Sequence, residues 1–181
     1  MQAPTLQTER LVLRPTLLSD FEAYAAFLSS DRAQYMDGPL SRDTAWTWFT
    51  NDTAHWQLFG FGGLMIETPD GAVAGQVAVT QGIAFPEPEL GWFLYDGFEG
   101  KGFASEAAIA LRKWVYDFAG LTTVVSYVSP ENLGSARVAQ RMGAVRDANA
   151  PLPAGETAEI THVYRHPSAD QLGDGGMEAY A

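Results

Sequence analysis

The sequence predicts an α+β (mixed α/β) fold in which helices pack on a central sheet. Strand-like and helix-like segments follow one another without strict alternation, in the order β-α-α-β-β-β-α-β-α-(β)-β, which is typical of this class. The length of 181 residues suffices for one domain with a sizeable core. A composition of 46% hydrophobic and 18% charged residues is that of a globular protein rather than of a fibre or a disordered chain.

The chain begins with a predicted strand and two predicted helices. Residues 8–15, TERLVLRP, alternate apolar and polar side chains and end at a proline, which indicates a short strand. Residues 18–30 and 41–59 each open on a capping residue and carry apolar residues at helical spacing. The apolar stripe of the second helix is imperfect, because Asp52 shares it with aromatic residues.

The middle of the chain predicts a hairpin, a further strand and a long helix. Residues 60–68 and 72–80 flank the turn Pro-Asp-Gly, as the two strands of a hairpin do. Residues 90–95 form the next apolar strand. Residues 103–119 keep helical spacing, and Gly120 follows at the position where glycine commonly ends a helix.

The remaining segments complete a single domain over residues 1–167. Residues 122–129 are rich in β-branched side chains and predict a strand. Residues 132–143 predict a short helix, and residues 159–166 a final strand. Residues 168–181 hold glycine and acidic residues without an apolar period, so we expect a flexible acidic tail.

Charge and residue types narrow the function classes. A formal net charge of −11 argues against a nucleic-acid partner, which needs a basic surface. The absence of cysteine excludes disulfides, thiolate metal sites and a cysteine nucleophile. The histidines His55, His162 and His166 have no metal-ligand spacing, so we expect no metal. Neither a signal peptide nor a membrane-spanning apolar run is apparent, and we expect a cytoplasmic protein without a membrane partner.

Residues 97–107, GFEGKGFASEA, suit a phosphate group. A P-loop requires G-x-x-x-x-G-K-[ST], and here the gap from Gly97 to Gly100 is too short while Gly102 follows Lys101. The dinucleotide fingerprint G-x-G-x-x-G fits only in part, since Ser105 stands at its last glycine. The free amides of the first helical turn would still bind a pyrophosphate. The alternative is a tight turn that binds nothing.

Two segments together resemble the GNAT N-acetyltransferase superfamily. Residues 89–114, ELGWFLYDGFEGKGFASEAAIALRKW, are similar to its acetyl-CoA-binding core, and residues 132–144, NLGSARVAQRMGA, to its second coenzyme-binding segment. The opening TERLVLRP and the form N-x-x-S-x-R-V resemble the RimJ/RimL branch. The resemblance spans residues 8–166 and implies a GNAT-like, mostly antiparallel twisted sheet flanked by helices, with a splayed strand pair holding CoA.

The resemblance also implies a coenzyme site. In the superfamily the loop reads Q/R-x-x-G-x-G/A and its amides hold the pyrophosphate of CoA, which here assigns Glu99, Gly100, Lys101, Gly102, Phe103 and Ala104. Glu99 departs from the pattern, and we expect its carboxylate to point outward, away from the pyrophosphate. The backbone of Phe93 and Leu94 would pair with the pantetheine arm and offer an N–H to the oxyanion. Asn132 would contact the pantetheine; the alternative for Asn132 is an N-cap, and both roles are compatible.

The catalytic groups are less determined by sequence. Glu89 is the first candidate for the general base, because it begins the strand that leads to the thioester; the alternative is a solvated carboxylate. Many relatives carry a tyrosine seven residues after the asparagine, where this chain has Ala139. The resemblance therefore implies Ser135 as the acid that protonates the departing thiolate, and Ser135 also belongs to the coenzyme segment.

Other side chains are weaker candidates. Tyr127 and Glu159 lie on neighbouring predicted strands, and the strand residue His162 is more often structural. Tryptophans at positions 46, 48 and 56 could line an acceptor pocket, but aromatic residues at that spacing usually belong to the core.

These observations predict an acetyl-CoA-dependent N-acetyltransferase. Acetyl-CoA is the implied co-substrate, and a primary amine, on a protein N-terminus or a small molecule, attacks it directly in a ternary complex. The alternative is a non-catalytic acyl-CoA-binding or regulatory module with the same fold. We expect a monomer or a homodimer, and the sequence does not name the acceptor.

Overall fold

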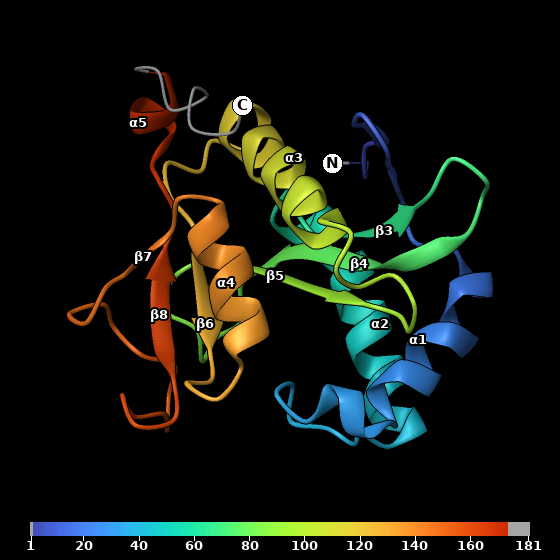
Figure 1. The fold of residues 1–181 in the computed structure, drawn as a ribbon, viewed down its shortest axis with the longest axis horizontal. Helices are drawn as coiled ribbons and strands as arrows, with labels where there is room; N and C mark the ends of the chain where they lie inside the picture. Colours follow the sequence, from blue (N-terminus) through green and yellow to red (C-terminus); the bar gives the residue numbers. More distant parts are fainter. Residues whose placement is uncertain (1, 174–181) are drawn as a thin grey trace.

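The structure, a computed structural model, describes residues 2–173 as an eight-stranded sheet flanked by helices (Figure 1). The strand order is β1-β2-β3-β4-β5-β6-β8-β7. Neighbouring strands run antiparallel, with β5 and β6 as the one parallel pair in this described part. The predicted fold class, a mostly antiparallel sheet flanked by helices, is confirmed.

Each segment predicted from sequence contains a helix or a strand, and most ends move by a few residues. The strands are β1 (Leu6–Gln7), β2 (Val12–Arg14), β3 (Gly63–Glu67), β4 (Val73–Thr80), β5 (Glu89–Leu94), β6 (Val125–Val128), β7 (Val145–Arg146) and β8 (His162–Arg165). The helices are α1 (Phe21–Leu28), α2 (Arg42–Leu58), α3 (Phe103–Phe118), α4 (Leu133–Arg141) and α5 (Ala169–Gly173), with 3-10 turns η1 (Leu18–Asp20) and η2 (Asp31–Ala33).

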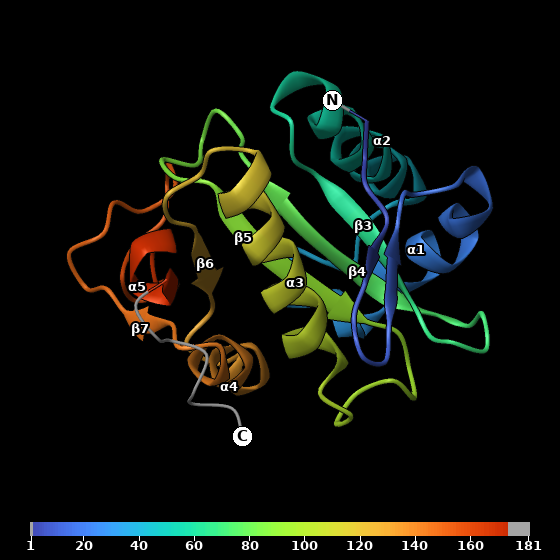
Figure 2. The ribbon, with the colours of Figure 1, turned by 90° about the horizontal axis from the view of Figure 1, so that it is seen from above.

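Helices cover both faces of the sheet. Helix α3 crosses β4 and β5 on one face, where its residues Ala107, Leu111 and Val115 join the largest apolar cluster (Figure 2). Helices α1 and α2 pack against each other and enclose a second cluster that includes Phe93 of β5. Because side chains alternate along a strand, Phe93 points to α1 and α2 while its neighbour Leu94 packs toward α3.

The predicted tail is described only in its first part. Ala169–Gly173 forms the short helix α5, and Ala169 and Leu172 pack against the main apolar cluster. Residues 174–181 lie outside the described part of the chain. The domain boundary at residue 167 stays a prediction. None of the helices within residues 2–173 is long and apolar enough to cross a membrane.

Helix α2 lies in direct contact with the start of β3. A Cβ atom on Gly62 would lie 2.6 Å from the Asp52 carbonyl oxygen and 2.7 Å from the Trp56 ring, so only glycine permits this approach. The Trp56 indole N–H donates to the Gly63 carbonyl at 2.9 Å and fixes the same contact. This close packing brings the middle of α2, and Asp52 with it, beside the centre of the sheet.

The parallel strands β5 and β6 pair only at their beginning. Their single registered pair among the described residues is Glu89 with Val125, and the Val125 amide donates to the Pro88 carbonyl at 3.0 Å. Along its other edge β5 pairs with β4 over its whole length, from Glu89 to Leu94. Beyond Leu90, β5 therefore has no strand partner on the β6 side, and the two strands separate.

A buried chain of polar groups holds the point where the strands separate. The Ser126 hydroxyl donates to the Leu90 carbonyl at 2.6 Å, and His166 Nε2 lies 2.9 Å from the same hydroxyl oxygen. Arg112 of α3 lies 3.3 Å from His166 Nδ1 and donates to the Met142 carbonyl at 2.8 Å. Burial lowers the pKa of His166 to about 3, with a further contribution from Arg112, so its imidazole is neutral.

We expect Ser126→Ala to lower the free energy of unfolding by about 1–3 kcal/mol, because it leaves buried polar groups of Leu90 and His166 without a partner. Urea unfolding measures the change. Ser29→Ala, which removes an exposed hydroxyl bonded to the Ala26 carbonyl, is the control. Equal stability of the two variants would contradict the role given to Ser126.

Candidate functional site

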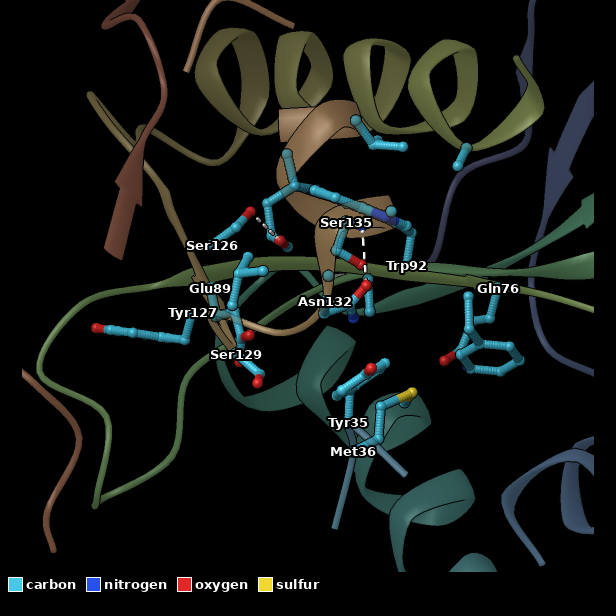
Figure 3. Close-up of a pocket in the computed structure, with 18 of the residues that line it drawn as sticks. Tyr35, Met36, Gln76, Glu89, Trp92, Ser126, Tyr127, Ser129, Asn132 and Ser135 are labelled. Atoms are coloured by element: carbon cyan, nitrogen blue, oxygen red, sulfur yellow. Dashed lines mark hydrogen bonds between the residues drawn. The ribbon is translucent and has the colours of Figure 1, made fainter. Parts of the chain in front are cut away.

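A cleft of about 1100 Å³ opens where β5 and β6 separate (Figure 3). Its walls come from β4, β5, β6, the start of α3, helix α4, helix α2 and the segment between α1 and α2. The two ends of this cleft are lined by chemically different groups. One end holds the glycine loop before α3 and the start of α4, and the other end holds carboxylates from α2 and β5.

The glycine loop gives α3 an open N-terminus that faces the cleft. Gly100 and Gly102 have φ of 74° and 81°, a left-handed conformation that favours glycine. Gly102 is the N-cap of α3 and has no side chain to bond the first-turn amides. The amides of Phe103 and Ala104 therefore remain available to an anion.

Ser105 is a further polar group at this end of the cleft, and sequence reasoning did not assign it a role. Its hydroxyl is buried, lines the cleft and has no hydrogen-bond partner within residues 2–173. A buried hydroxyl without a partner costs free energy unless a ligand or water satisfies it. The loop therefore fits a phosphate-bearing group such as the diphosphate of coenzyme A.

Most of the predicted loop residues line this cleft, and Lys101 does not. Glu99, Gly100, Gly102, Phe103 and Ala104 are all on its wall. The Lys101 ammonium lies 5.4 Å from the centre of the Phe98 ring and lines a separate hollow. Its carbonyl accepts a hydrogen bond from Arg10 at 2.8 Å, which fixes the loop backbone.

Glu99 does not turn away from the site as expected. Glu99 is on the cleft wall, and its carboxylate forms an ion pair with Arg32, another wall residue, which comes from the segment between α1 and α2. The guanidinium supplies the compensating charge, so the carboxylate can stay beside the loop. Sequence reasoning missed Arg32, because no local pattern links it to a loop more than sixty residues away.

The two predicted backbone sites on β5 face different ways. A Cβ atom on Gly75 would lie 2.1 Å from the Phe93 carbonyl oxygen, so the polar groups of Phe93 face β4. Its ring is buried and stacks on Phe27, with 4.4 Å between ring centres. Phe93 is on the cleft wall, but its ring belongs to the core and its backbone pairs with β4. The Leu94 carbonyl accepts from Arg32 at 3.0 Å on the cleft side, which leaves Leu94 as the candidate.

Asn132 and Ser135 lie together on the cleft wall (Figure 3). The Asn132 side-chain oxygen accepts a hydrogen bond from the Ser135 amide at 3.0 Å, so Asn132 is the N-cap of α4. Its amide nitrogen is not used in that bond, which leaves the coenzyme role compatible with the cap. Ala139, at the position of the missing tyrosine, is fully buried in a small apolar cluster.

Glu89 lies at the other end of the cleft, at the first position of β5. Burial raises the pKa of Glu89 to about 7, and the nearby carboxylates of Glu156 and Asp52 add to the rise. A hydrogen bond from the Tyr127 backbone opposes it. A carboxylate with this pKa can take and release a proton near neutral pH.

Asp52 is the residue that sequence reasoning missed at this end. Burial raises the pKa of Asp52 to about 6, opposed by a hydrogen bond from the Tyr24 hydroxyl at 3.2 Å. Its side chain lines the cleft because α2 packs closely on β3. The signal was present in the sequence as the one carboxylate on the apolar stripe of the second helix.

The carboxylates at this end have no ion-pair partner within residues 2–173, although the nearby His55 lowers the pKa of Asp52. Asp52, Glu89 and Glu156 all line the cleft, and none forms an ion pair with another described residue. Other partly buried carboxylates are paired, as Asp20 is with Arg14 and Glu87 with Arg165. An unpaired acidic wall attracts a protonated amine.

The weaker candidates from the sequence differ in whether they line the cleft. Tyr127 lines the cleft, and burial raises its pKa to about 12, so it stays protonated at neutral pH and is no base. Glu159 and His162 do not line the cleft. Of the tryptophans, Trp56 is core, Trp46 is exposed, and Trp48 alone lines the cleft.

Comparisons with known proteins agree with this architecture. Residues 10–145 match the acetyltransferase (GNAT) domain family. The crystal structure of an acetyltransferase from Agrobacterium tumefaciens shares 46% identity over 92% of this chain and 95% of its own, with a TM-score of 0.85. RimL, a ribosomal L7/L12 α-N-protein acetyltransferase solved with coenzyme A, has a TM-score of 0.72 over 91% of this chain and 98% of its own. At 17% identity that likeness shows the fold alone.

A curated relative matches a shorter segment. The uncharacterized N-acetyltransferase YnaD of Bacillus subtilis is 34% identical over 59 residues, which span 33% of this chain and 35% of that protein. The family match covers three quarters of the present chain, and the relatives carry acetyltransferase names. These findings do not support a non-catalytic module. The chain belongs to the GNAT acetyltransferase family, whose members are acetyl-CoA-dependent acyltransferases.

Proposed function

We propose that this protein transfers an acetyl group from acetyl-CoA to a primary amine that is protonated in solution. The observation that carries the proposal is the division of one cleft into an anion-binding end and an acidic end. The open N-terminus of α3 and the Ser105 hydroxyl suit the diphosphate. The unpaired carboxylates at the other end suit the amine and its proton.

The roles of the residues follow from their places in the cleft. Glu89 would remove the proton from the bound ammonium, because the neutral amine is the nucleophile. The Leu94 amide would face the thioester oxygen and stabilise the oxyanion. The Ser135 hydroxyl would donate to the departing thiolate and take a replacement proton from water in the same step; a thiol pKa of about 8.5 makes the thiolate a good leaving group already.

The finer assignment to the RimJ/RimL-like branch is part of the proposal. It is supported by the opening TERLVLRP and by the form N-x-x-S-x-R-V, which places Ser135 three residues after Asn132. This branch would direct the enzyme to the amine of a protein N-terminus rather than to a small molecule. A cytoplasmic location and a monomeric or homodimeric state stay predictions.

Two measurements test the proposal. Calorimetry with acetyl-CoA measures binding of the coenzyme, and release of free thiol measures transfer to each member of a panel of amines. The panel contains peptides with free N-termini, polyamines and lysine. We expect millimolar or tighter binding and thiol release with at least one amine. No binding would overturn the proposal, and binding without release on any amine would favour the non-catalytic alternative.

The glycine loop is tested by a matched pair of substitutions. Gly97 and Gly100 both have positive φ, 82° and 74°, and neither has a neighbour within 4 Å of an added Cβ. Gly100 lines the cleft and Gly97 does not. Gly100→Asp is expected to abolish coenzyme binding by its bulk and charge, while Gly97→Asp shares the backbone strain and keeps binding. Equal coenzyme affinity of the two variants, measured by calorimetry, would contradict the loop assignment.

The general base is tested by pH dependence. With Glu89 as base, kcat rises as the pH increases through about 7, since only the deprotonated carboxylate accepts a proton. Glu89→Gln is expected to lower kcat about 10²–10⁴-fold and to remove this rise, with little change in acetyl-CoA affinity. Glu159→Gln, which changes an exposed carboxylate outside the cleft, is the control. An unchanged profile in Glu89→Gln would assign the base to another group.

Asp52 is expected to act on both the acceptor and the base. Asp52→Asn removes a negative charge that raises the Glu89 pKa, so the rise of kcat shifts to lower pH. The KM of a cationic amine is expected to increase about 3- to 10-fold from the lost attraction. Asp43→Asn, at the exposed start of the same helix, is the control. If the pH midpoint of the rise in kcat stays in place or moves upward in Asp52→Asn, the two carboxylates are not coupled.

A further inference from the structure

The segment between α1 and α2 spans the mouth of the cleft. Residues 31–36, called the strap here, contact the structure on both sides of the opening. On one side Arg32 reaches the end of β5, and on the other the Tyr35 hydroxyl donates to the Glu131 carbonyl at 3.4 Å. Figure 3 shows Tyr35 and Met36 facing Asn132 across the cleft. The strap therefore lies over the route between the two separated strands.

Arg32 is the part of the strap that is fixed most firmly. Its guanidinium donates to the Leu94 carbonyl at 3.0 Å and to Asp96 at 3.2 Å, and it forms an ion pair with Glu99. It also lies 5.8 Å from the centre of the Phe27 ring. Leu94 ends β5, while Asp96 and Glu99 belong to the loop that leads into α3, and both Arg32 and Gly100 line the cleft.

The charges at this place need an explanation. Glu99 and Asp96 put two carboxylates in the loop that precedes a helix N-terminus whose amides are open to an anion. Without a cation, those carboxylates would repel a diphosphate. The ion pairs are exposed, with Arg32 at 39%, Glu99 at 44% and Asp96 at 95%, so they contribute little to folding stability. These ion pairs are explained if their role is to hold the Arg32 guanidinium in position near the loop.

We propose that Arg32 contacts the diphosphate of coenzyme A, and that Glu99 is the positioning residue that holds its guanidinium beside the glycine loop. The planar guanidinium has several N–H donors, so it can bond Glu99 and the Leu94 carbonyl and still donate to a phosphate oxygen. Glu99, which departs from the superfamily's loop pattern, would then support coenzyme binding through Arg32 instead of weakening it. This inference rests on the proposed use of acetyl-CoA.

The consequence is that the strap and the coenzyme depend on each other. A diphosphate that bonds Arg32 holds the strap against the loop, and the strap also carries Met36, which lines the same cleft. Coenzyme bound at one end thereby sets part of the wall along the rest of the cleft. A lysine at position 32 would supply the charge but only a single nitrogen, and it could not bond three acceptors with the same geometry.

The test compares three ligands by calorimetry: coenzyme A, dephospho-CoA, which keeps the diphosphate, and pantetheine, which lacks it. Arg32→Ala is expected to weaken coenzyme A and dephospho-CoA alike, by about 10- to 100-fold, because a charge-assisted bond is lost and Glu99 is left uncompensated. Pantetheine affinity is expected to fall much less, because pantetheine has no diphosphate to bond Arg32. Arg32→Ala/Glu99→Gln is expected to recover part of the loss, since the repelling carboxylate is gone.

Arg42→Ala is the matched control. Arg42 also pairs with a carboxylate, Glu22, and also lies over a ring, that of Phe21, but it does not line the cleft. We expect no change in any of the three affinities, and circular dichroism with urea unfolding checks that each variant is folded. Equal coenzyme A affinity of wild type and Arg32→Ala would overturn this inference and leave the proposed function standing. An equal loss of affinity for pantetheine would do the same. Failure of the wild-type protein to bind coenzyme A would overturn the proposed function as well.

Discussion

The separation of β5 from β6 is the constraint on which the site depends. A single registered pair, Glu89 with Val125, and the bond from Ser126 to the Leu90 carbonyl hold the strands together at one end. Beyond that point no described strand pairs with β5 on the β6 side. Arg32 bonds the Leu94 carbonyl there, and the remaining backbone groups need a ligand or water. The buried contacts of His166 and Arg112 fix the point where the two strands separate, on the side of α3. The opening between the strands is therefore built into the packed core.

The two ends of the cleft have opposite electrostatic character, and a different set of groups produces it at each end. The anion end relies on a helix N-terminus and on Arg32, in a chain that carries a formal net charge of −11. The acidic end relies on burial, which raises the pKa values of Asp52 and Glu89, and neither carboxylate forms an ion pair within residues 2–173. An acceptor with a positive charge and a co-substrate with negative charges would therefore enter one cleft in one relative orientation.

Sequence patterns predicted most of the fold, because strand alternation, caps and glycine turns are local. The loop before α3 was found for the same reason, since its glycines and the helix that follows are adjacent in the chain. Arg32 and Asp52 could not be placed in this way. Their positions depend on how α1 and α2 pack on the sheet, and Gly62 permits that packing through contacts that sequence spacing does not show. The Phe93 backbone was assigned to the cleft wrongly, because a single strand pattern does not tell which edge pairs with β4.

The coupling of Asp52 to Glu89 links acceptor binding to proton removal. A carboxylate that attracts an ammonium also raises the pKa of its neighbour, so the wall that binds the protonated amine makes Glu89 a stronger proton acceptor. When the ammonium arrives, its positive charge lowers the pKa of Glu89 again and favours the ionised form that can act as the base. An isolated exposed glutamate would lack this adjustment, because water would screen both effects. The burial of Asp52, which α2 provides by its contact with β3, is therefore part of the chemistry as well as of the fold.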